Sequence, residues 1–341
     1  MTKRATLKDI AIAANVSAAT VSYILNNTPG KTISDETRRR VLAAAERLQY
    51  VPNTSAQRLK TNRAKCIAVR LNHNLVMARY HNMLQGIRSY LNSQGYSLLL
   101  ASHDGRGSLA GCIDACISGQ ADGLIYIAAQ HVGIRPKELA QIRERGIPVS
   151  AIDCMGNVPD VSSVVYDYYA SSRARMEYLL ERGFRKFLYL RPLFQNYKET
   201  AREQGVRSVM LERSDVSVEV RTLDCLDENW QANIRYSMLP TDYGLVRNIR
   251  DIMDGLPGDV AVVCYAREAQ EMVSRILFTQ SMLHPTPESA RWYLRTISYH
   301  FPHFDAGVEA ARSLLNKLNG DQSVRKLSLQ PVLDFVDPEL Y

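Results

Sequence analysis

The sequence predicts a small all-α domain followed by a larger α/β domain that is made of two doubly wound halves. Three observations lead to this fold class. The first 50 residues hold short helical patterns with cap residues at their starts. The remainder alternates short apolar runs with amphipathic segments, which is typical of parallel sheets covered on both faces. Its length of roughly 280 residues exceeds an ordinary single domain and suits two subdomains.

The first domain opens with two short helices in close succession. Thr6 is a suitable cap for a first helix with Asp9 at its third position, and Asn15 ends that helix. Ser17 caps the second helix after a very tight connection. Residues expected to be buried are Leu7, Ile10, Ala11, Ala14, Val21, Ile24 and Leu25, and those expected to face outward on the second helix are Ala18, Ala19, Ser22, Tyr23 and Asn26. Helices joined so closely cross steeply, which is the helix-turn-helix geometry.

A third helix and a short fourth element complete this part of the chain. The third helix begins at Ser34, and its expected buried side chains are Val41, Leu42, Ala45 and Leu48. We expect residues 1–52 to form the helical domain and residues 53–62 to form a hinge helix with a linker. A helix of about two turns is marginal in water by itself, so we expect the hinge to order only against a partner.

Charge is concentrated in the same region. Residues 1–65 contain 12 Lys and Arg against 4 Asp and Glu, whereas the rest of the chain contains 30 against 31. The net charge of +7 therefore belongs to the small domain. A locally basic helical domain favours nucleic acid as its partner. The run Arg38–Arg40 is equally consistent with a solvated helix face.

Three motifs in this region fall in order at characteristic spacings. They are V-S-x-x-T-V-S from Val16 to Ser22, S-x-x-T from Ser34 to Thr37, and Y-x-P-N from Tyr50 to Asn53. In these motifs the chain closely resembles the lactose-repressor (LacI) family of bacterial transcription regulators. The resemblance implies that the second helix enters the DNA major groove. It implies the following DNA-contacting residues: Thr6, Ser17, Ala18, Ala19, Thr20, Ser22, Tyr23, Asn26, Thr37, Tyr50, Asn53, Ala56, Leu59 and Lys60.

The reading positions of this helix are unusual in their chemistry. Ala18 and Ala19 offer only methyl contacts, so Tyr23 is the first candidate for a hydrogen bond to a base. Tyr23 is also consistent with an ordinary solvated side chain. The resemblance further implies that two hinge helices pair in the minor groove, where Leu59 wedges between base steps and Lys60 lies beside it. The alternative is a plain linker whose Leu59 packs on the next domain.

The larger domain, residues 63–341, shows alternating strands and helices. Strands are expected at 66–71, 97–102, 123–128, 148–153, 161–166, 187–190, 218–223 and 260–265, and helices near 80–94, 108–119, 136–145, 169–182, 198–211 and 244–255. We expect a first subdomain of about 63–160 plus 291–320 and a second of about 161–290 plus 321–341. This part is similar, more loosely, to the family's periplasmic-binding-protein-like core of two Rossmann-like subdomains, in which a ligand binds at the carboxyl ends of the strands.

Several residues of the larger domain match or depart from the family's ligand-binding pattern. Asp153 ends a strand at the I-D-R position, although Cys154 replaces the arginine, and Arg202 to Gly205 matches R-x-x-G. Ala266–Arg267 stands where relatives commonly have Asn-Asp, and Asp167–Tyr168 stands where D-N is usual. The expected effector-binding residues are Asn72, Asp153, Arg202, Arg267 and Tyr299. Hydrogen-bonding groups have thus been lost from the expected pocket.

Two interpretations of the core stay open. The first is an effector unlike sugars and nucleobases, anionic because of Arg202, Arg267 and Arg191. The second is a core that binds no small molecule and serves dimerisation or a protein partner. Arg202 is also consistent with a structural ion pair to Glu199 or Asp227, and Arg267 with a surface position.

Other residue clusters do not predict chemistry. Six cysteines without C-x-x-C spacing, including Cys112 and Cys116, indicate reduced thiols, and His300 and His303 indicate loop histidines and no metal site. Gly105 to Gly111 only approximates a dinucleotide fingerprint. We expect no cofactor and no enzymatic activity, because no catalytic set is recognisable. Without an apolar run of 18 residues or a secretory signal, we expect a cytoplasmic protein that associates with the nucleoid when bound to DNA and has no membrane partner.

The sequence as a whole predicts a transcription regulator, by default a repressor. We expect a homodimer on a pseudo-palindromic double-stranded DNA operator, because two-fold protein symmetry requires two-fold sites. A dimer is favoured over a tetramer because residues 332–338 show no terminal heptad. The alternatives are a regulator whose core binds no ligand and, from another class, an enzyme or solute-binding protein on the same core.

Overall fold

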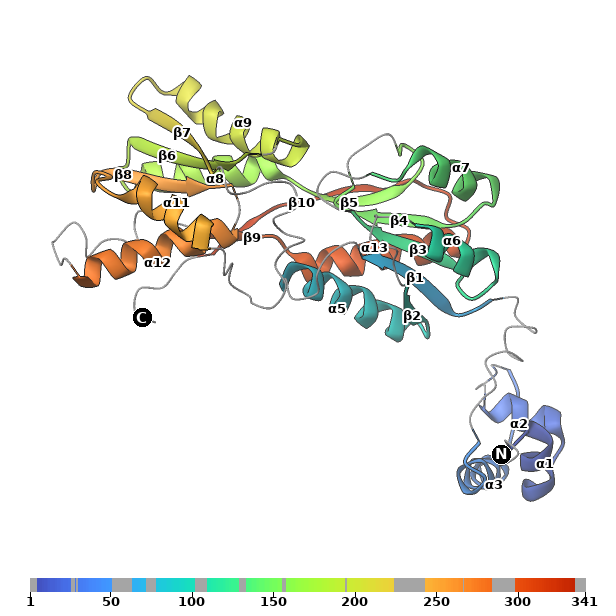
Figure 1. Cartoon of the computed structure of the whole chain (residues 1–341). Helices are drawn as coiled ribbons and strands as arrows, with labels where there is room; N and C mark the ends of the chain where they lie inside the picture. Colours follow the sequence, from blue (N-terminus) through green and yellow to red (C-terminus); the bar gives the residue numbers. More distant parts are fainter. Residues whose placement is uncertain are drawn as a thin grey trace. The chain divides into compact units, whose positions relative to one another are not determined.

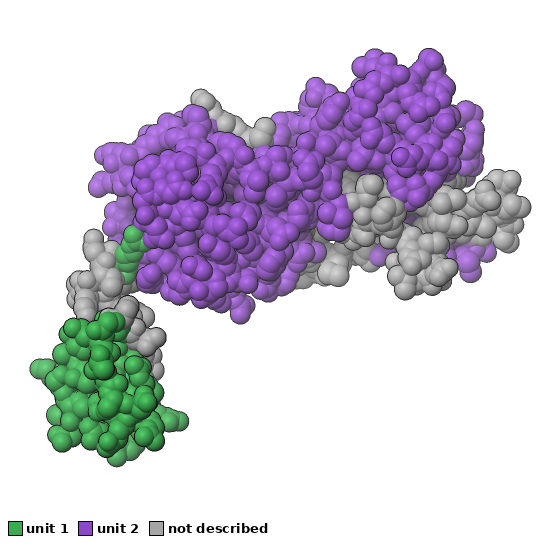
Figure 2. Space-filling view, turned by 180° about the vertical axis from the view of Figure 1, so that it is seen from behind, with its two compact units in different colours: residues 1–63 green, residues 64–341 purple. Residues whose placement is uncertain are grey.

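The computed structural model of the chain forms two compact units, residues 1–63 and 64–341 (Figures 1 and 2). The residues that the structure describes are 5–25, 28, 30–50, 63–71, 78–101, 109–128, 133–154, 158–193, 195–223, 243–265, 267–283 and 298–334. Within this part of the chain, no helix is both long and apolar enough to cross a bilayer.

The first unit contains the three expected helices, α1 (Leu7–Ala14), α2 (Ala18–Leu25) and α3 (Asp35–Arg47). Thr6 and Asp9 form a full capping box at the start of α1, and Asn15 ends that helix in the left-handed region with φ of 51°. The core of the unit is made by Ile10, Ala11, Ala14, Val21, Ile24, Val41 and Ala44.

One expected core residue of the first unit lies on the surface. Leu42 is 48% exposed, and the buried face of α3 is formed by Val41 and Ala44, with Leu48 packed against them. The reason is the helical period: positions 41, 44 and 48 share one face, whereas position 42 is rotated about 100° from 41. The expectation for Leu42 was wrong.

The second unit is built around a six-stranded parallel sheet with the order β10-β5-β4-β3-β1-β2. Its strands are β1 (Cys66–Leu71), β2 (Ser97–Leu100), β3 (Gly123–Ile127), β4 (Val149–Ile152), β5 (Ser162–Tyr166) and β10 (Lys326–Leu329). Alternate residues of β1 face opposite layers: Ile67 and Val69 join one core cluster with helices α5 (Ala78–Ser93) and α13 (His303–Leu318), and Ala68 joins another with α6 (Ala110–Ile117) and α7 (Pro136–Glu144). We call this sheet with its four helices the first lobe.

A smaller parallel sheet, β7-β6-β8, forms the second lobe. It contains β6 (Lys186–Pro192), β7 (Ser217–Leu223) and β8 (Val260–Cys264), with helices α8 (Tyr168–Glu181), α9 (Tyr197–Glu212), α11 (Tyr243–Met253) and α12 (Arg267–Leu283). A separate antiparallel pair joins β9 (Ser298–His300) to β11 (Val332–Asp334). Figure 1 shows the two parallel sheets side by side within the unit.

Two strands lie in a different lobe from the one expected. Residues 161–166 and 321–341 were assigned to the second subdomain, but β5 pairs with β4 and β10 pairs with β5 inside the first lobe. The physical reason is that β5, although it begins with two serines, is a largely buried strand that pairs with β4 and extends the first sheet, so the chain enters the second lobe at the turn into α8. The alternating pattern alone does not mark that crossing.

Candidate functional site

The first turn of α2 presents two small exposed side chains. The Ser17 Oγ accepts a hydrogen bond from the Thr20 amide at 3.0 Å and lies 2.9 Å from the Thr20 Oγ1, which fixes the start of the helix. Ala18 and Ala19 are exposed at this start. Because no long side chain stands on this turn, another surface can approach its backbone closely.

Tyr23 lies one turn further along α2. Its side chain is half-buried, and the Lys31 Nζ lies 5.2 Å from the centroid of its ring. A cation at this distance interacts favourably with the ring face. The ring of Tyr23 therefore has a lysine from the loop before α3 beside it, and its role as a DNA-reading or a solvated side chain stays a prediction.

The other expected DNA-contacting residues fall into two groups. Thr6 and Thr37 are engaged in the caps of α1 and α3, where Thr37 accepts a hydrogen bond from the Ser34 Oγ at 2.9 Å. Ser22 is half-buried on α2, and Tyr50 packs against the core of the unit. Asn26, Asn53, Ala56, Leu59 and Lys60 lie outside the described residues, so the hinge-helix expectation is left as it stands.

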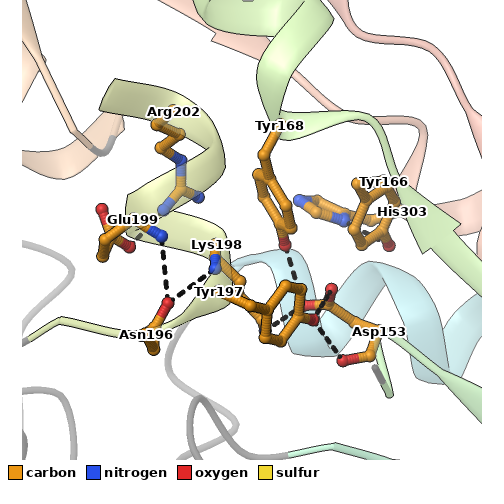
Figure 3. Close-up of polar contacts among 9 residues, drawn as sticks. All are labelled: Asp153, Tyr166, Tyr168, Asn196, Tyr197, Lys198, Glu199, Arg202 and His303. Carbon is orange, nitrogen blue, oxygen red and sulfur yellow. Dashed lines mark hydrogen bonds and ion pairs between the residues drawn. The ribbon is translucent and has the colours of Figure 1, made fainter. Parts of the chain in front are cut away.

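A second site lies where the two lobes of the larger unit meet (Figure 3). It consists of Asp153, Tyr168, Tyr197, Lys198, Glu199 and Arg202, which we call the inter-lobe cluster. Asp153 follows β4 of the first lobe and adopts φ of 57°, the left-handed region, with its amide donating to the Val164 carbonyl at 2.7 Å. Asp tolerates this conformation better than most residues.

The carboxylate of Asp153 receives donors from the second lobe. Its Oδ2 accepts hydrogen bonds from the Tyr168 hydroxyl at 2.8 Å and from the Lys198 ammonium, and its Oδ1 accepts one from the Tyr197 hydroxyl at 3.1 Å. The Tyr197 hydroxyl also lies 2.9 Å from the Asp153 carbonyl oxygen. Tyr168 begins α8, and Tyr197 and Lys198 begin α9, so first turns of two helices converge on one carboxylate.

Local sequence signals place these first turns. The Asp167 side chain caps α8 by accepting from the Ala170 amide at 2.8 Å, and the Asn196 side chain caps α9 by accepting from the amides of Lys198 and Glu199 at 2.8 and 3.0 Å. Gly205 allows α9 to approach α8, because a Cβ there would lie 2.3 Å from the Tyr169 carbonyl oxygen. The two caps and the close approach of α8 and α9 at Gly205 together place the first turns of both helices beside Asp153.

Arg202 and Glu199 form a second buried ion pair one turn along α9. The Arg202 Cζ lies 4.3 Å from the centroid of the Tyr168 ring, which links this pair to the Asp153 contacts. Oε2 of Glu199 is buried and accepts no hydrogen bond. The structural pairing of Arg202 with Glu199 that the sequence left open is thus present, together with an orphan carboxylate oxygen.

Burial dominates the electrostatics of the inter-lobe cluster. It raises the pKa of the Tyr168 and Tyr197 hydroxyls, and the charge of Asp153 raises both further. Burial also lowers the pKa of Lys198 against the opposing effect of Asp153, and it raises the pKa of Glu199 against the opposing effect of Arg202. The tyrosines therefore stay neutral donors.

Aromatic side chains surround the first-lobe edge of the cluster. Tyr166 lies 4.7 Å from Phe301 and 5.1 Å from His303 between ring centroids, and its hydroxyl is 2.8 Å from the His303 Nδ1. His300 ends β9 and His303 begins α13, so the expectation that both lie in a loop was wrong. Among the described side chains, no group of three or more His, Cys, Asp or Glu is placed to hold a metal ion.

The structure brings together Asp153 and Arg202 from the expected effector set. Arg267 begins α12, and Tyr299 lies in β9 opposite Leu333. Asn72 and the side chains of Arg267 and Tyr299 lie outside the described residues. Arg191, which the sequence suggested as an anion ligand, pairs with Glu203 at 3.2 Å. The sequence analysis did not identify Tyr197 and Lys198. The only feature that could have pointed to them is their position in the first turn of the helix that carries the R-x-x-G motif.

The fold and the sites together define a helix-turn-helix protein with a two-lobed, periplasmic-binding-protein-like core. Family models support both parts: bacterial regulatory proteins of the lacI family match residues 6–53, and periplasmic binding proteins and the sugar-binding domain of the LacI family match residues 70–224. The chain belongs to the lacI family of bacterial regulatory proteins.

Individual proteins to which the chain is similar are also transcriptional repressors. The HTH-type transcriptional repressor PurR of Serratia proteamaculans (strain 568) is 28% identical over 223 residues, which cover 64% of this chain and 62% of that protein. PurR of Pectobacterium atrosepticum is 30% identical over 185 residues, or 53% of this chain and 52% of that protein. The chain thus spans little more than half the length of these relatives. A lac repressor dimer bound to operator and the anti-inducer ONPF has a TM-score of 0.70 at 19% identity, covering 97% of this chain and 98% of that one, which shows the shared fold.

Proposed function

We propose that the chain is a sequence-specific DNA-binding transcription regulator, a repressor that binds a pseudo-palindromic operator as a homodimer. The observation that carries this proposal is the exposed first turn of α2, capped by Ser17, within the basic segment 1–65, whose net charge is +8. A capped helix start offers amides and small side chains to a groove, and the basic charge neutralises phosphates. A regulator of this kind works in the cytoplasm, associated with the nucleoid.

In this proposal Ala18, Ala19 and Tyr23 read the major groove and the cap hydroxyls of Ser17, Thr6 and Thr37 position the unit on the backbone. The two alanines supply apolar contacts to thymine methyl groups. Tyr23 supplies the hydrogen bond, and Lys31 orients its ring. The hinge residues Leu59 and Lys60 add minor-groove contacts at the centre of the operator.

Selection from genomic fragments, followed by a salt titration of the selected site, tests DNA binding. We expect the logarithm of the affinity to fall steeply and linearly with the logarithm of salt concentration. Ala19→Glu places a carboxylate on the reading turn and should abolish specific binding. The matched control is Ala13→Glu, an exposed alanine on α1, which should bind as the wild type does. Equal loss in both variants, or no selected site, contradicts the proposal.

We further propose that the inter-lobe cluster responds to a small anionic effector. Lys198, Arg202 and the nearby Arg79, whose charge acts on both Lys198 and Glu199, outnumber the carboxylates of Asp153 and Glu199. An excess of positive groups around a largely buried site, with Arg79 at its half-buried edge, favours an anion. The alternative that the sequence left open is a regulator whose core binds no small molecule. It is favoured by Asp153, because donors within the chain already occupy both oxygens of its carboxylate.

Thermal-shift screening of carboxylates and phosphates separates these two alternatives. A bound anion should raise the melting temperature of the wild type in proportion to its saturation. The double variant Glu199→Gln, Arg202→Met removes both charges of the internal pair and should lose the shift. A melting temperature that no anion changes would favour the ligand-free regulator.

A further inference from the structure

Asp153 is the point at which the chain itself joins the two lobes. Its carboxylate comes from the first lobe, and its donors, the Tyr168 and Tyr197 hydroxyls and the Lys198 ammonium, come from the second. The side chains of Lys198 and Asp153 are only 7% and 10% exposed. Both oxygens of the carboxylate therefore accept hydrogen bonds from donors within the chain.

We propose that Lys198 is a tethered cation that holds the two lobes of the core together on Asp153 in the absence of a small molecule. It acts where an external ligand would otherwise bridge the lobes. The inference deepens the proposed function, because it gives the regulated core a closed state that needs no effector. Lys198 is a positioning residue in this scheme, since it acts through Asp153.

The charge of Lys198 is favoured by Asp153 and, more weakly, by the rings of Tyr168 and Tyr197, whose centroids lie 5.8 and 5.6 Å from its Nζ. The first turn of a helix carries the positive end of the helix dipole, which disfavours a cation. Arg202 and Arg79 add two further positive charges whose effect on Lys198 is also unfavourable. Within this cluster the attraction that opposes burial comes from Asp153. A lysine that its own helix disfavours is thus stabilised across the lobe boundary.

The same balance makes the closure reversible. Burying two charges costs nearly as much as their mutual attraction returns, so a buried ion pair contributes little net stability. Opening the lobes returns both charges to water, which compensates the lost contact. Removing only the ammonium is different, because it leaves a buried carboxylate with two hydroxyl donors and no counter-charge, and hydration of that carboxylate then favours the open state.

Hydroxyl-radical footprinting of the full chain tests this proposal, because it measures how exposed each tyrosine side chain is. Tyr168 is 6% exposed where the lobes meet, whereas Tyr126 and Tyr189 are each 1% exposed inside the first and second lobes. Lys198→Met keeps the length of the side chain and removes its charge. We expect the labelling rate of Tyr168 to rise about tenfold in this variant, with Tyr126 and Tyr189 unchanged.

Lys186→Met is the matched control, because it removes a lysine of the same lobe whose ion pair with Asp259 is about 59% exposed. It should leave Tyr168 protected. Unchanged labelling of Tyr168 in Lys198→Met would overturn the proposal. If all three tyrosines become labelled, the variant has unfolded, and Asp153→Asn decides, because it removes the counter-charge of Lys198 and keeps a side chain that tolerates the left-handed backbone. A rise confined to Tyr168 in that variant supports the proposal, and no rise refutes it. The assay contains no DNA, so its outcome does not depend on whether the chain binds an operator, and a failure of the proposed function can be told apart from a failure of this proposal.

Discussion

The crossing of α5 and α13 in the first lobe depends on two glycines that face each other's helix backbone. A Cβ on Gly86 would lie 2.0 Å from the Phe304 carbonyl oxygen, and a Cβ on Gly307 would lie 2.1 Å from the Met83 carbonyl oxygen. Backbone atoms cannot rotate away as side chains can. Each alanine therefore forces the helices apart by about 1 Å, which loosens the close packing along their whole interface.

Gly86→Ala and Gly307→Ala should each lower the free energy of unfolding by about 1–3 kcal/mol, the usual cost of overpacking. The better helix propensity of alanine offsets up to about 1 kcal/mol of this in each case. In the double variant one separation of the helices relieves both clashes. The loss should therefore be smaller than the sum of the single losses, by about 1 kcal/mol.

Urea denaturation followed by circular dichroism measures these differences on the full chain. Gly133→Ala is the control, because a Cβ there meets no atom within 4 Å, and its effect should stay within about 0.5 kcal/mol. Strictly additive losses in the double variant would refute the idea of a shared crossing. Single losses no larger than that of the control would refute the clash itself.

Three further changes follow from particular contacts. Ser17→Ala removes the acceptor of the Thr20 amide and should cost the first unit about 1 kcal/mol in thermal unfolding, whereas Ser17→Asp should restore it. Burial raises the pKa of Cys112 and Cys264 to about 12, so roughly one of these thiols in ten thousand is ionised at pH 8. Iodoacetamide should therefore modify both cysteines far more slowly in the native chain than in the urea-unfolded chain. Peptide mass spectrometry measures the two rates. A hydrogen bond from Arg143 lowers the pKa of Asp160 from 3.8 to about 2, so the stabilising effect of this exposed pair is present above pH 4 and is lost as the pH falls toward 2. Asp160→Asn should remove that part of the acid dependence of unfolding.

Elements governed by short-range signals could be predicted from the sequence. Ser17, Ser34 and the Thr6–Asp9 pair start helices where their hydrogen-bonding capacity predicts, and strands such as residues 66–71 follow directly from apolar runs. These signals depend on neighbours within about four residues. Leu42 shows the limit even here, because choosing which of two adjacent apolar residues is buried requires the packing partner of the helix.

The inter-lobe cluster could be predicted only in part. Asp153 and Arg202 were identified from their positions at a strand end and a helix start, but their partners were not. Lys198 lies 45 residues from Asp153, and Tyr168 lies 15 residues from it. Pairing over such separations depends on where β5 ends and on how closely α8 and α9 cross, and neither is encoded in a local pattern. The lobe assignment of β5 failed for the same reason.

The charges of the inter-lobe cluster also bear on why the core is not simply sealed with apolar residues. Replacing a buried ion pair by well-packed hydrophobic side chains is often neutral or stabilising. Such a replacement at Asp153 and Lys198 would give a core that stays closed, because apolar surface always loses on exposure to water. An ion pair flanked by the orphan oxygen of Glu199 behaves differently, since its members gain hydration or a new partner when the lobes part. On the proposed role of Lys198, the polar cluster therefore gives up stability of the closed state and brings it closer in free energy to an open one, and a ligand can shift a population only when two such states lie within reach of its binding energy.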